Sequence, residues 1–237
     1  MHQLTGYHRP ATVEEALNLL DGTRVVLAGG TTIRHDGGGT PVEVVDIQAL
    51  GFDTVTVTPD RVEVGSTVTL QALVDNAEVP QLMRDAAQAE LPSTLRSVAT
   101  VGGTIVTGGS ESLFLAALLV HDALVHFVDD TAKDLRTVLR DRVGRGDLIV
   151  GINVTPGGTS AIASTKRTPA DTPIVAAVGR EAHDHLHIAL CGVAPSPLLV
   201  DPSELDHLNP PEDFRGSSDY RRHLARVLTA RVVKELT

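Results

Sequence analysis

The chain has little sulfur and few aromatic side chains. Its 237 residues include one cysteine, Cys191, and no tryptophan, and aromatic residues make up only 3%. A single thiol forms no disulfide within the chain and cannot hold an iron–sulfur cluster, which takes four cysteines or a mixed ligand set. If the protein takes part in electron transfer, the iron–sulfur clusters therefore lie in another polypeptide. We expect Cys191 to be a buried strand residue.

Excess basic charge and long apolar runs are also lacking. The formal net charge is −10 at pH 7, which argues against a nucleic-acid-binding surface. The longest wholly apolar run, residues 113–120, is too short to cross a bilayer, and the first residues lack the pattern of a signal peptide. We therefore expect a cytoplasmic protein with no membrane span and no nucleic-acid partner.

Two glycine pairs are the most informative feature that is present. Gly29 and Gly30 follow the apolar run 25–28, which predicts a short buried strand, and Gly102 and Gly103 follow residues 94–101. Each pair, with a threonine after it, predicts a tight turn whose successive backbone N–H groups are free to point at an anion. Such turns suit a phosphate bridge that is held mainly by main-chain donors.

The hydrophobic pattern predicts a mixture of helices and strands up to residue 156. A capping box at Thr12 and Glu15 begins a helix that ends near residue 20, and two alternating runs, 54–57 and 62–64, predict a hairpin. Further helices are predicted at 70–76, 81–89 and 112–120, and further strands at 124–128 and 147–154.

A domain boundary is predicted at residues 156–158, because Pro-Gly-Gly interrupts regular structure between two periodic regions. The segments beyond it predict an antiparallel meander of three strands, at 160–164, 174–180 and 185–191. A final helix is predicted from an apolar stripe formed by Leu224, Leu228, Val232 and Leu236. The pattern fits a small α+β domain.

The motifs occur in an order that resembles a known family. They are Tyr-x-x-Pro, Ala-Gly-Gly-Thr, Val-Asp-Ile, Gly-Ser-x-Val-Thr-Leu, Ala-Thr-Val-Gly-Gly and a last segment with Asp-Tyr-Arg-Arg, at residues 7–10, 28–31, 45–47, 65–70, 99–103 and 219–222. In this order they resemble the FAD-binding medium subunit of the molybdenum hydroxylases, the group that contains xanthine dehydrogenase and carbon monoxide dehydrogenase. The resemblance spans nearly the whole chain.

The resemblance implies an α+β fold with two domains. Residues 1–156 would form a two-part FAD-binding domain of the p-cresol methylhydroxylase type, with α/β lobes over about 1–52 and 53–156. Residues 159–237 would form a small C-terminal domain with an antiparallel sheet and a helix.

The resemblance also implies a function within a complex. A molybdopterin large subunit would oxidise the substrate, an iron–sulfur small subunit would relay the electrons, and this flavoprotein oxidoreductase subunit would pass them through its FAD to an external acceptor. Because the flavin carries the redox chemistry, no side chain of this chain is expected to be catalytic, and none is expected to bind a metal.

The expected FAD contacts follow from the motifs of the family. The two glycine segments would hold the pyrophosphate, and the segment after the second would contact the ribityl chain or the adenosine. The expected cofactor-binding residues are Ala28, Gly29, Gly30, Thr31, Thr32, Thr100, Gly102, Gly103 and Thr104, followed by Ser110, Glu111 and Ser112.

Two departures from the family pattern leave a second interpretation open. The family has an asparagine where this chain has Thr104, and it has an aspartate that contacts the flavin nucleotide where ungapped alignment places Leu113. The chain is therefore interpreted either as an FAD subunit or as a degenerate member of the family. Such a member would keep the fold, would have lost FAD, and would act as an assembly or interaction subunit.

Other polar residues are interpreted mainly as structural. His183, His185 and His187 alternate, which predicts that they share one face of a strand, and an exposed polar face accounts for them without a metal. Arg96 precedes the second glycine pair, where it either faces a ligand or, as we favour, holds that segment in place.

Overall fold

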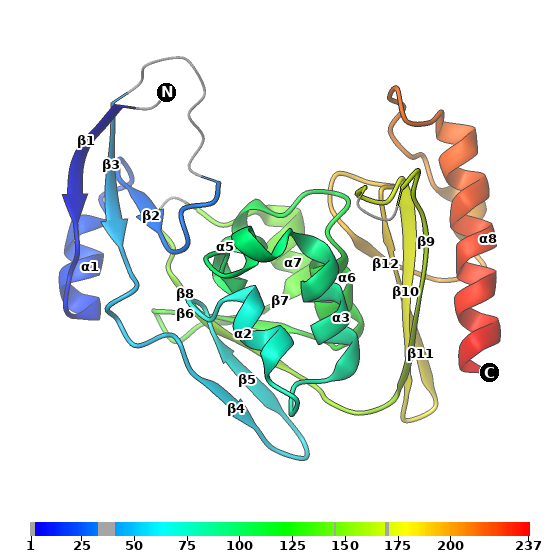
Figure 1. Cartoon of the computed structure of the whole chain (residues 1–237), viewed down its shortest axis with the longest axis horizontal. Coiled ribbons are helices and arrows are strands. Elements are labelled where there is room, and N and C mark those ends of the chain that lie inside the picture. Colours follow the sequence, from blue (N-terminus) through cyan, green and yellow to red (C-terminus); the bar gives the residue numbers. More distant parts are fainter. Residues whose placement is uncertain (1–2, 33–40, 145, 169–170) are drawn as a thin grey trace.

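The computed structural model of the chain describes residues 3–32, 41–144, 146–168 and 171–237. In these residues the strands form three sheets, and Figure 1 shows three bodies in a row, which we name the N-terminal, central and C-terminal parts. Over the described ranges, no helix combines the length and the apolar character needed to cross a bilayer.

The N-terminal part is a small parallel sheet with one helix. Its elements are β1 (Gln3–His8), α1 (Val13–Leu19), β2 (Val25–Leu27) and β3 (Pro41–Asp46), and β3 lies between the other two strands. Thr12 begins α1 by accepting a hydrogen bond from the Glu15 amide, as the capping box predicts. Ala16 of α1 packs with Val45 and Ile47 in a small hydrophobic core.

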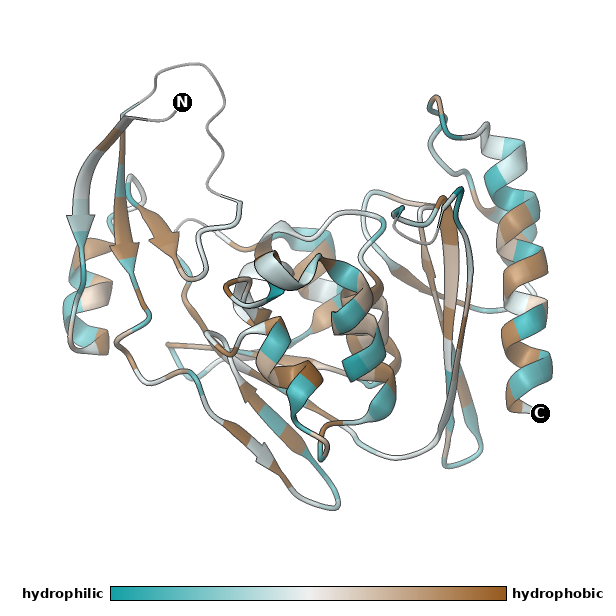
Figure 2. Ribbon diagram, viewed as in Figure 1, coloured by the Kyte–Doolittle hydropathy of each residue, from teal (hydrophilic) through white to brown (hydrophobic). Residues whose placement is uncertain are grey.

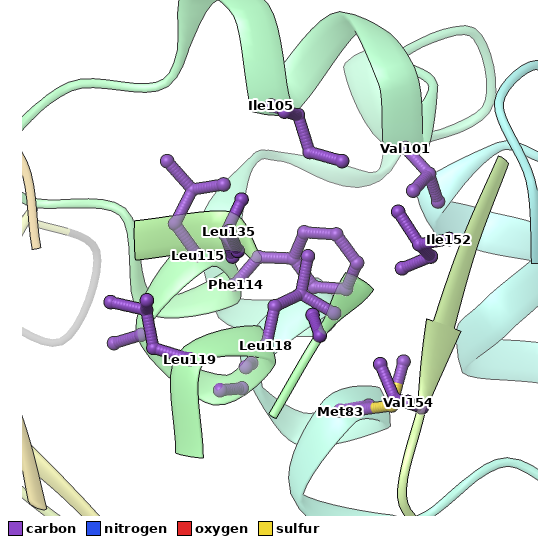
Figure 3. Packing of buried hydrophobic residues seen from close by; sticks show 14 of the residues in the cluster. Met83, Val101, Ile105, Phe114, Leu115, Leu118, Leu119, Leu135, Ile152 and Val154 are labelled. Carbon is purple, nitrogen blue, oxygen red and sulfur yellow. The ribbon is translucent and has the colours of Figure 1, made fainter. Parts of the chain in front are cut away.

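The central part is built on an antiparallel sheet in the order β4-β5-β8-β6-β7. Its strands are β4 (Val55–Val57), β5 (Val62–Gly65), β6 (Leu124–Phe127), β7 (Ala132–Asp134) and β8 (Ile149–Val154). Its helices are α2 (Leu70–Asp75), α3 (Gln81–Glu90), α4 (Ser93–Arg96), α5 (Val101–Thr107), α6 (Leu113–Val120) and α7 (Leu135–Asp141). Every residue of α6 is buried, and Figure 3 shows its Phe114 in the middle of a cluster that includes Ile105 and Ile152.

The C-terminal part is an antiparallel sheet that packs against α6 of the central part on one face and against its own last helix on the other. Its strands are β9 (Thr159–Thr165), β10 (Val175–Ala182), β11 (His185–Cys191) and β12 (Leu198–Val200), in the order β12-β11-β10-β9. A short 3-10 helix, η1 (Leu205–His207), precedes α8 (Ser218–Leu236). Figure 1 places α8 on the outer face of this sheet, and Figure 2 shows that hydrophilic and hydrophobic residues alternate along α8.

Alternation along β10 explains how this sheet has two apolar faces. Ala176 and Val178 join the core of the central part, which includes α6. Val175 and Ala177 face the opposite way and join a second core with Leu228 of α8. The C-terminal part is therefore attached to the central part by a buried apolar surface.

Most of the predicted elements are confirmed, including the hairpin, the meander and the last helix. The predicted tight turn at Gly102 and Gly103 is wrong, because both residues lie in the first turn of α5, which Thr100 caps. The prediction that His183 shares a strand face with the two histidines that follow is also wrong. His183 lies in the turn between β10 and β11, with a φ of 52°.

The α+β class is confirmed, and buried Cys191 at the end of β11 agrees with its expected place. The division of the chain into domains at residues 156 and 159 stays a prediction. In the structure, residues 155–158 form a connection without helix or strand between β8 and β9.

Candidate functional site

A cleft of about 440 Å³ lies between the N-terminal and central parts. It is bordered by β2 and the segment after it, by the first turn of α5, and by the residues just before β8. Val25 of β2 is partly exposed, so the prediction that this strand is buried is wrong. The lining brings both glycine pairs together, and it includes Ala28, Gly29, Gly30, Thr31, Thr32, Ser66, Thr100, Gly102, Gly103, Val106 and Thr107.

The first glycine pair crosses the chain that leads into α5. A Cβ atom on Gly29 would overlap the carbonyl oxygen of Val98, so only glycine permits this close approach of two backbones. Gly30 has a φ of +71°, in the left-handed region that favours glycine. Both glycines are therefore explained by backbone geometry alone.

In the segment 28–32, three successive backbone amides form no hydrogen bond within the described residues. Its carbonyl groups are held from the side of β3, since the Leu27 oxygen accepts from the Ile47 amide at 3.0 Å and the Ala28 oxygen accepts from the Gln48 side chain at 2.6 Å. Within the described residues, the amides of Gly29 and its two successors donate to no protein acceptor. Successive free N–H groups of this kind form a concavity that suits an anion.

The second glycine pair is different, because its amides are already used. The Gly102 amide donates to the Ser66 oxygen at 2.8 Å, and the Gly103 amide donates to the Thr100 hydroxyl at 3.1 Å. The Thr104 hydroxyl donates to the Thr100 carbonyl oxygen at 2.9 Å. The prediction that both glycine pairs present free amides is therefore wrong for the second pair.

Ser66 is a residue of the cleft that the sequence analysis did not single out as a binding residue. It follows β5, lines the cleft and is 2% exposed, and its hydroxyl has no hydrogen-bond partner among the described residues. A Cβ atom on Gly102 would lie 2.9 Å from the Ser66 Cβ atom, which explains why glycine is needed there. The Gly-Ser-x-Val-Thr-Leu motif contained this residue, but the motif alone does not indicate burial.

The segment 110–112 has another environment. Ser110 accepts from the Gly192 amide at 2.8 Å, and Arg215 forms an ion pair with Glu111. Ser112 caps α6 through its hydroxyl. These three residues and Thr104 are not among the described residues that line the cleft, so their contact with the cofactor stays a prediction.

The charged groups at the cleft are mostly paired. In the described lining, Arg24 is the one basic residue, and its guanidinium contacts Glu43 at 2.7 Å and Asp21 at 3.0 Å. The Arg24 guanidinium, with a smaller effect from His8, holds the pKa of the Glu43 carboxyl below its usual range. The cleft therefore offers a ligand hydrogen-bond donors rather than an unpaired cation in the part of the chain that is described.

Arg96 has the structural role that we favoured. Its guanidinium donates to the Gln71 side chain at 3.1 Å and to the carbonyl oxygens of Gln88 and Leu91 at 2.8 Å each. These bonds fasten α4 to α2 and α3, and so position the chain that enters α5.

The residues present fit a cofactor that contains a pyrophosphate. The cleft volume lies in the usual range of ligand pockets, about 300–1,000 Å³. Within the described residues, the unpaired amides of Gly29, Gly30 and Thr31 belong to one side of its lining, and Ser66, whose hydroxyl has no partner there, belongs to another. A cleft between two lobes with these donors is what a protein that binds a nucleotide cofactor needs.

A comparison with protein families assigns the chain to one family of nucleotide-binding proteins. The family described as the FAD binding domain in molybdopterin dehydrogenase matches residues 2–141. The chain belongs to this family, which confirms the resemblance found in the sequence and gives FAD as the cofactor. It is therefore a flavoprotein subunit of the oxidoreductase class.

Relatives extend the match to the C-terminal part. The protein named "Uncharacterized protein YgfM" of Escherichia coli strain K12 is 30% identical over 243 residues, which cover 94% of this chain and 93% of the relative. The xanthine dehydrogenase FAD-binding subunit of Escherichia coli O157:H7 is 24% identical over 283 residues, which cover 99% of this chain and 97% of the relative.

Solved structures share the whole fold. Quinoline 2-oxidoreductase from Pseudomonas putida 86 has a chain that matches with a TM-score of 0.88 at 17% identity, covering 100% of this chain and 98% of that chain. Carbon monoxide dehydrogenase from Hydrogenophaga pseudoflava matches with a TM-score of 0.86 at 20% identity, with the same coverage. The arrangement of the three parts is therefore that of a known fold.

Proposed function

We propose that this chain binds FAD in the cleft and passes electrons from the iron–sulfur clusters of a partner subunit to an external acceptor. The complex would be of the molybdenum hydroxylase type, with a molybdopterin large subunit and an iron–sulfur small subunit. The observation that carries the proposal is that Gly29, Gly30 and Thr31 line a cleft of suitable volume in a chain of this family, and that their amides donate to no acceptor within the described residues.

FAD, when bound, supplies the redox chemistry, and the protein supplies position and environment. The amides of Gly29, Gly30 and Thr31 would hold the pyrophosphate, and the hydroxyls of Thr31 and Thr32 would add donors at the same place. Val106 and Ile149 give the cleft apolar lining, which would exclude water from the cofactor. No side chain needs to act as an acid, a base or a nucleophile.

The need for partners follows from the cysteine content. With Cys191 alone, and that thiol buried, the chain cannot hold the clusters that would deliver electrons. The relative named as a xanthine dehydrogenase subunit supports the proposal that this chain also works within a complex. Membership of the FAD-binding family favours this proposal over a degenerate subunit that has lost FAD.

The test is flavin binding by purified protein, with a matched pair of glycine variants. Gly30 and Gly22 both have positive φ, +71° and +87°, so valine strains the backbone at either position. Of these two glycines, Gly30 lines the cleft, and Gly22 is not among the described lining residues. We expect near-stoichiometric FAD in the wild type and in Gly22→Val, but none in Gly30→Val, when flavin is released and quantified after incubation with excess FAD and desalting.

The result has two clear alternatives. Full FAD occupancy of Gly30→Val would contradict the place assigned to the cofactor. A wild-type protein that takes up no added FAD, yet still associates with the two partner subunits, would replace the proposal with the assembly subunit considered from Thr104 and Leu113.

A further inference from the structure

The wall of the cleft holds one buried hydroxyl that the protein leaves without a partner. Ser66 is fixed on both sides by its backbone, since its amide donates to the Val150 oxygen at 3.0 Å and its oxygen accepts from the Gly102 amide at 2.8 Å. The residue is 2% exposed, and the side-chain oxygen has no hydrogen bond in the described parts of the chain. Buried side-chain polar atoms nearly always have a partner, so this exception needs a reason.

The neighbouring hydroxyls on α5 are already engaged. Thr100 accepts from the Gly103 amide and so caps the helix. Thr104 and Thr107 donate to carbonyl oxygens one turn earlier, at 2.9 Å and 2.8 Å. Among the described lining residues on this side of the cleft, Ser66 therefore has the buried hydroxyl that makes no hydrogen bond within the protein.

We propose that the Ser66 hydroxyl is a cofactor-binding group that forms a hydrogen bond with the sugar–phosphate part of FAD. This inference rests on the proposed function. A serine hydroxyl can donate to a phosphate oxygen and can accept from a sugar hydroxyl, so either group satisfies it. The amides of residues 29–31 and the Ser66 hydroxyl then hold the cofactor from two different segments, which follow β2 and β5.

The rest of the site supports this assignment. The second glycine pair has no free amide to offer, because Gly102 donates to Ser66 itself and Gly103 donates to Thr100. Donors on the α5 side must therefore come from a side chain. Glycine at 102 lets the first turn of α5 lie against Ser66, where any larger residue would press on the Ser66 Cβ atom.

Thr67 provides a matched control. It is also buried, at 7% exposed, and its hydroxyl also has no partner within the described ranges. Thr67 is not among the described residues that line the cleft. Ser66→Ala and Thr67→Val thus remove the same chemical group from neighbouring positions, and only the first removes it from the cleft.

The experiment measures two quantities for each variant, the dissociation constant for FAD by flavin fluorescence and the melting temperature of the apoprotein. For Ser66→Ala we expect FAD to bind about tenfold more weakly, since a hydrogen bond to the cofactor is lost. The melting temperature should stay unchanged or rise, because the variant removes a buried group without a partner. For Thr67→Val we expect unchanged FAD affinity and the same behaviour on melting.

The role of Ser66 and the proposed function can be contradicted by different results. Unchanged FAD affinity in Ser66→Ala, with normal binding by the wild type, would overturn the role of Ser66 and leave the proposed function in place. A lower melting temperature together with weaker FAD binding in Ser66→Ala would mean a structural role and would also overturn it. A wild-type protein without FAD binding would contradict the proposed function itself.

Discussion

Residues of the same type have different roles in this molecule, because their atoms contact different neighbours. Gly29 and Gly102 look alike in the sequence, yet one must avoid the Val98 carbonyl and the other the Ser66 side chain. His121 shows the same principle for a titratable group. It is 2% exposed, its Nδ1 donates to the Thr155 oxygen at 2.8 Å, and its Nε2 has no partner in the described residues.

His121 predicts a loss of stability in mild acid. Burial lowers its pKa from 6.5 to about 4, so the folded state binds fewer protons than the unfolded state between these values. Stability then falls as pH falls from about 6.5 to 4, and the contribution at pH 5 is about 2 kcal/mol less than at pH 7. His121→Asn keeps a donor for Thr155 without titrating, so urea unfolding at pH 7 and pH 5 should show a smaller difference than in the wild type.

A comparison of the two proteins at pH 8 provides the control. There the imidazole is neutral in both states, so any difference in unfolding free energy reports only the cost of the substitution. An equal dependence on pH in wild type and His121→Asn would show that this histidine does not carry the effect.

At the scale of elements, α5 connects the core of the central part to the cleft proposed to hold FAD. It begins at Val101, whose amide donates to the Val68 oxygen at 2.9 Å, and its first turn forms part of the cleft wall. The helix has only seven residues, so its N-cap is a large share of what holds it in place. A substitution at this N-cap should therefore lower both the affinity for FAD and the free energy of unfolding.

Thr100→Ala tests this coupling. Loss of the N-cap should lower the unfolding free energy by about 1 kcal/mol and should weaken FAD binding, because the first turn of α5 becomes less ordered. Ser217→Ala removes the N-cap of α8, which lies away from the cleft, and should cost similar stability without changing FAD affinity. Equal FAD affinity in the two variants would show that α5 is positioned by its packing rather than by its cap.

How far the sequence predicts such elements depends on their length and isolation. The capping box at Thr12 and the stripe on α8 identified helices correctly because both signals are local. The sequence predicts a tight turn at Gly102 and Gly103, where the structure has the first turn of α5, because two adjacent glycines disfavour a helix. Three contacts override that preference: the Thr100 cap, the Val68 carbonyl and the Ser66 carbonyl. Short strands such as β12 carry too few residues for their pattern to be read.

At the scale of the whole molecule, Arg180 joins the central and C-terminal parts. Its guanidinium is buried and donates to the carbonyl oxygens of Val120, Pro156 and Gly157 at 2.9–3.1 Å. Asp122 lies 3.6 Å from it. One side chain thus connects the end of α6, the connection at 155–158 and β10.

Arg180→Met predicts a weaker attachment of the C-terminal part. Three carbonyl groups, of which that of Val120 is buried, lose a charged donor, which should lower the unfolding free energy by about 3 kcal/mol. The connection at 155–158 should become more sensitive to limited proteolysis. Arg140→Met is the control, because Arg140 is largely exposed and its pair with Asp141 contributes little. Identical proteolysis of wild type and Arg180→Met would contradict this role.

The sequence by itself determined the family, most of the elements and their order, because capping, periodicity and motif spacing are properties of neighbouring residues. It also predicted that both glycine pairs belong to one site, and both line the same cleft. Only the tertiary structure decided which hydrogen-bond donors the cleft offers. The Gly102 amide donates to the carbonyl oxygen of Ser66, which follows β5, and the Ser66 hydroxyl is buried without a partner among the described residues. The availability of a hydrogen-bond donor depends on which acceptors distant segments bring to it, and no local pattern records that.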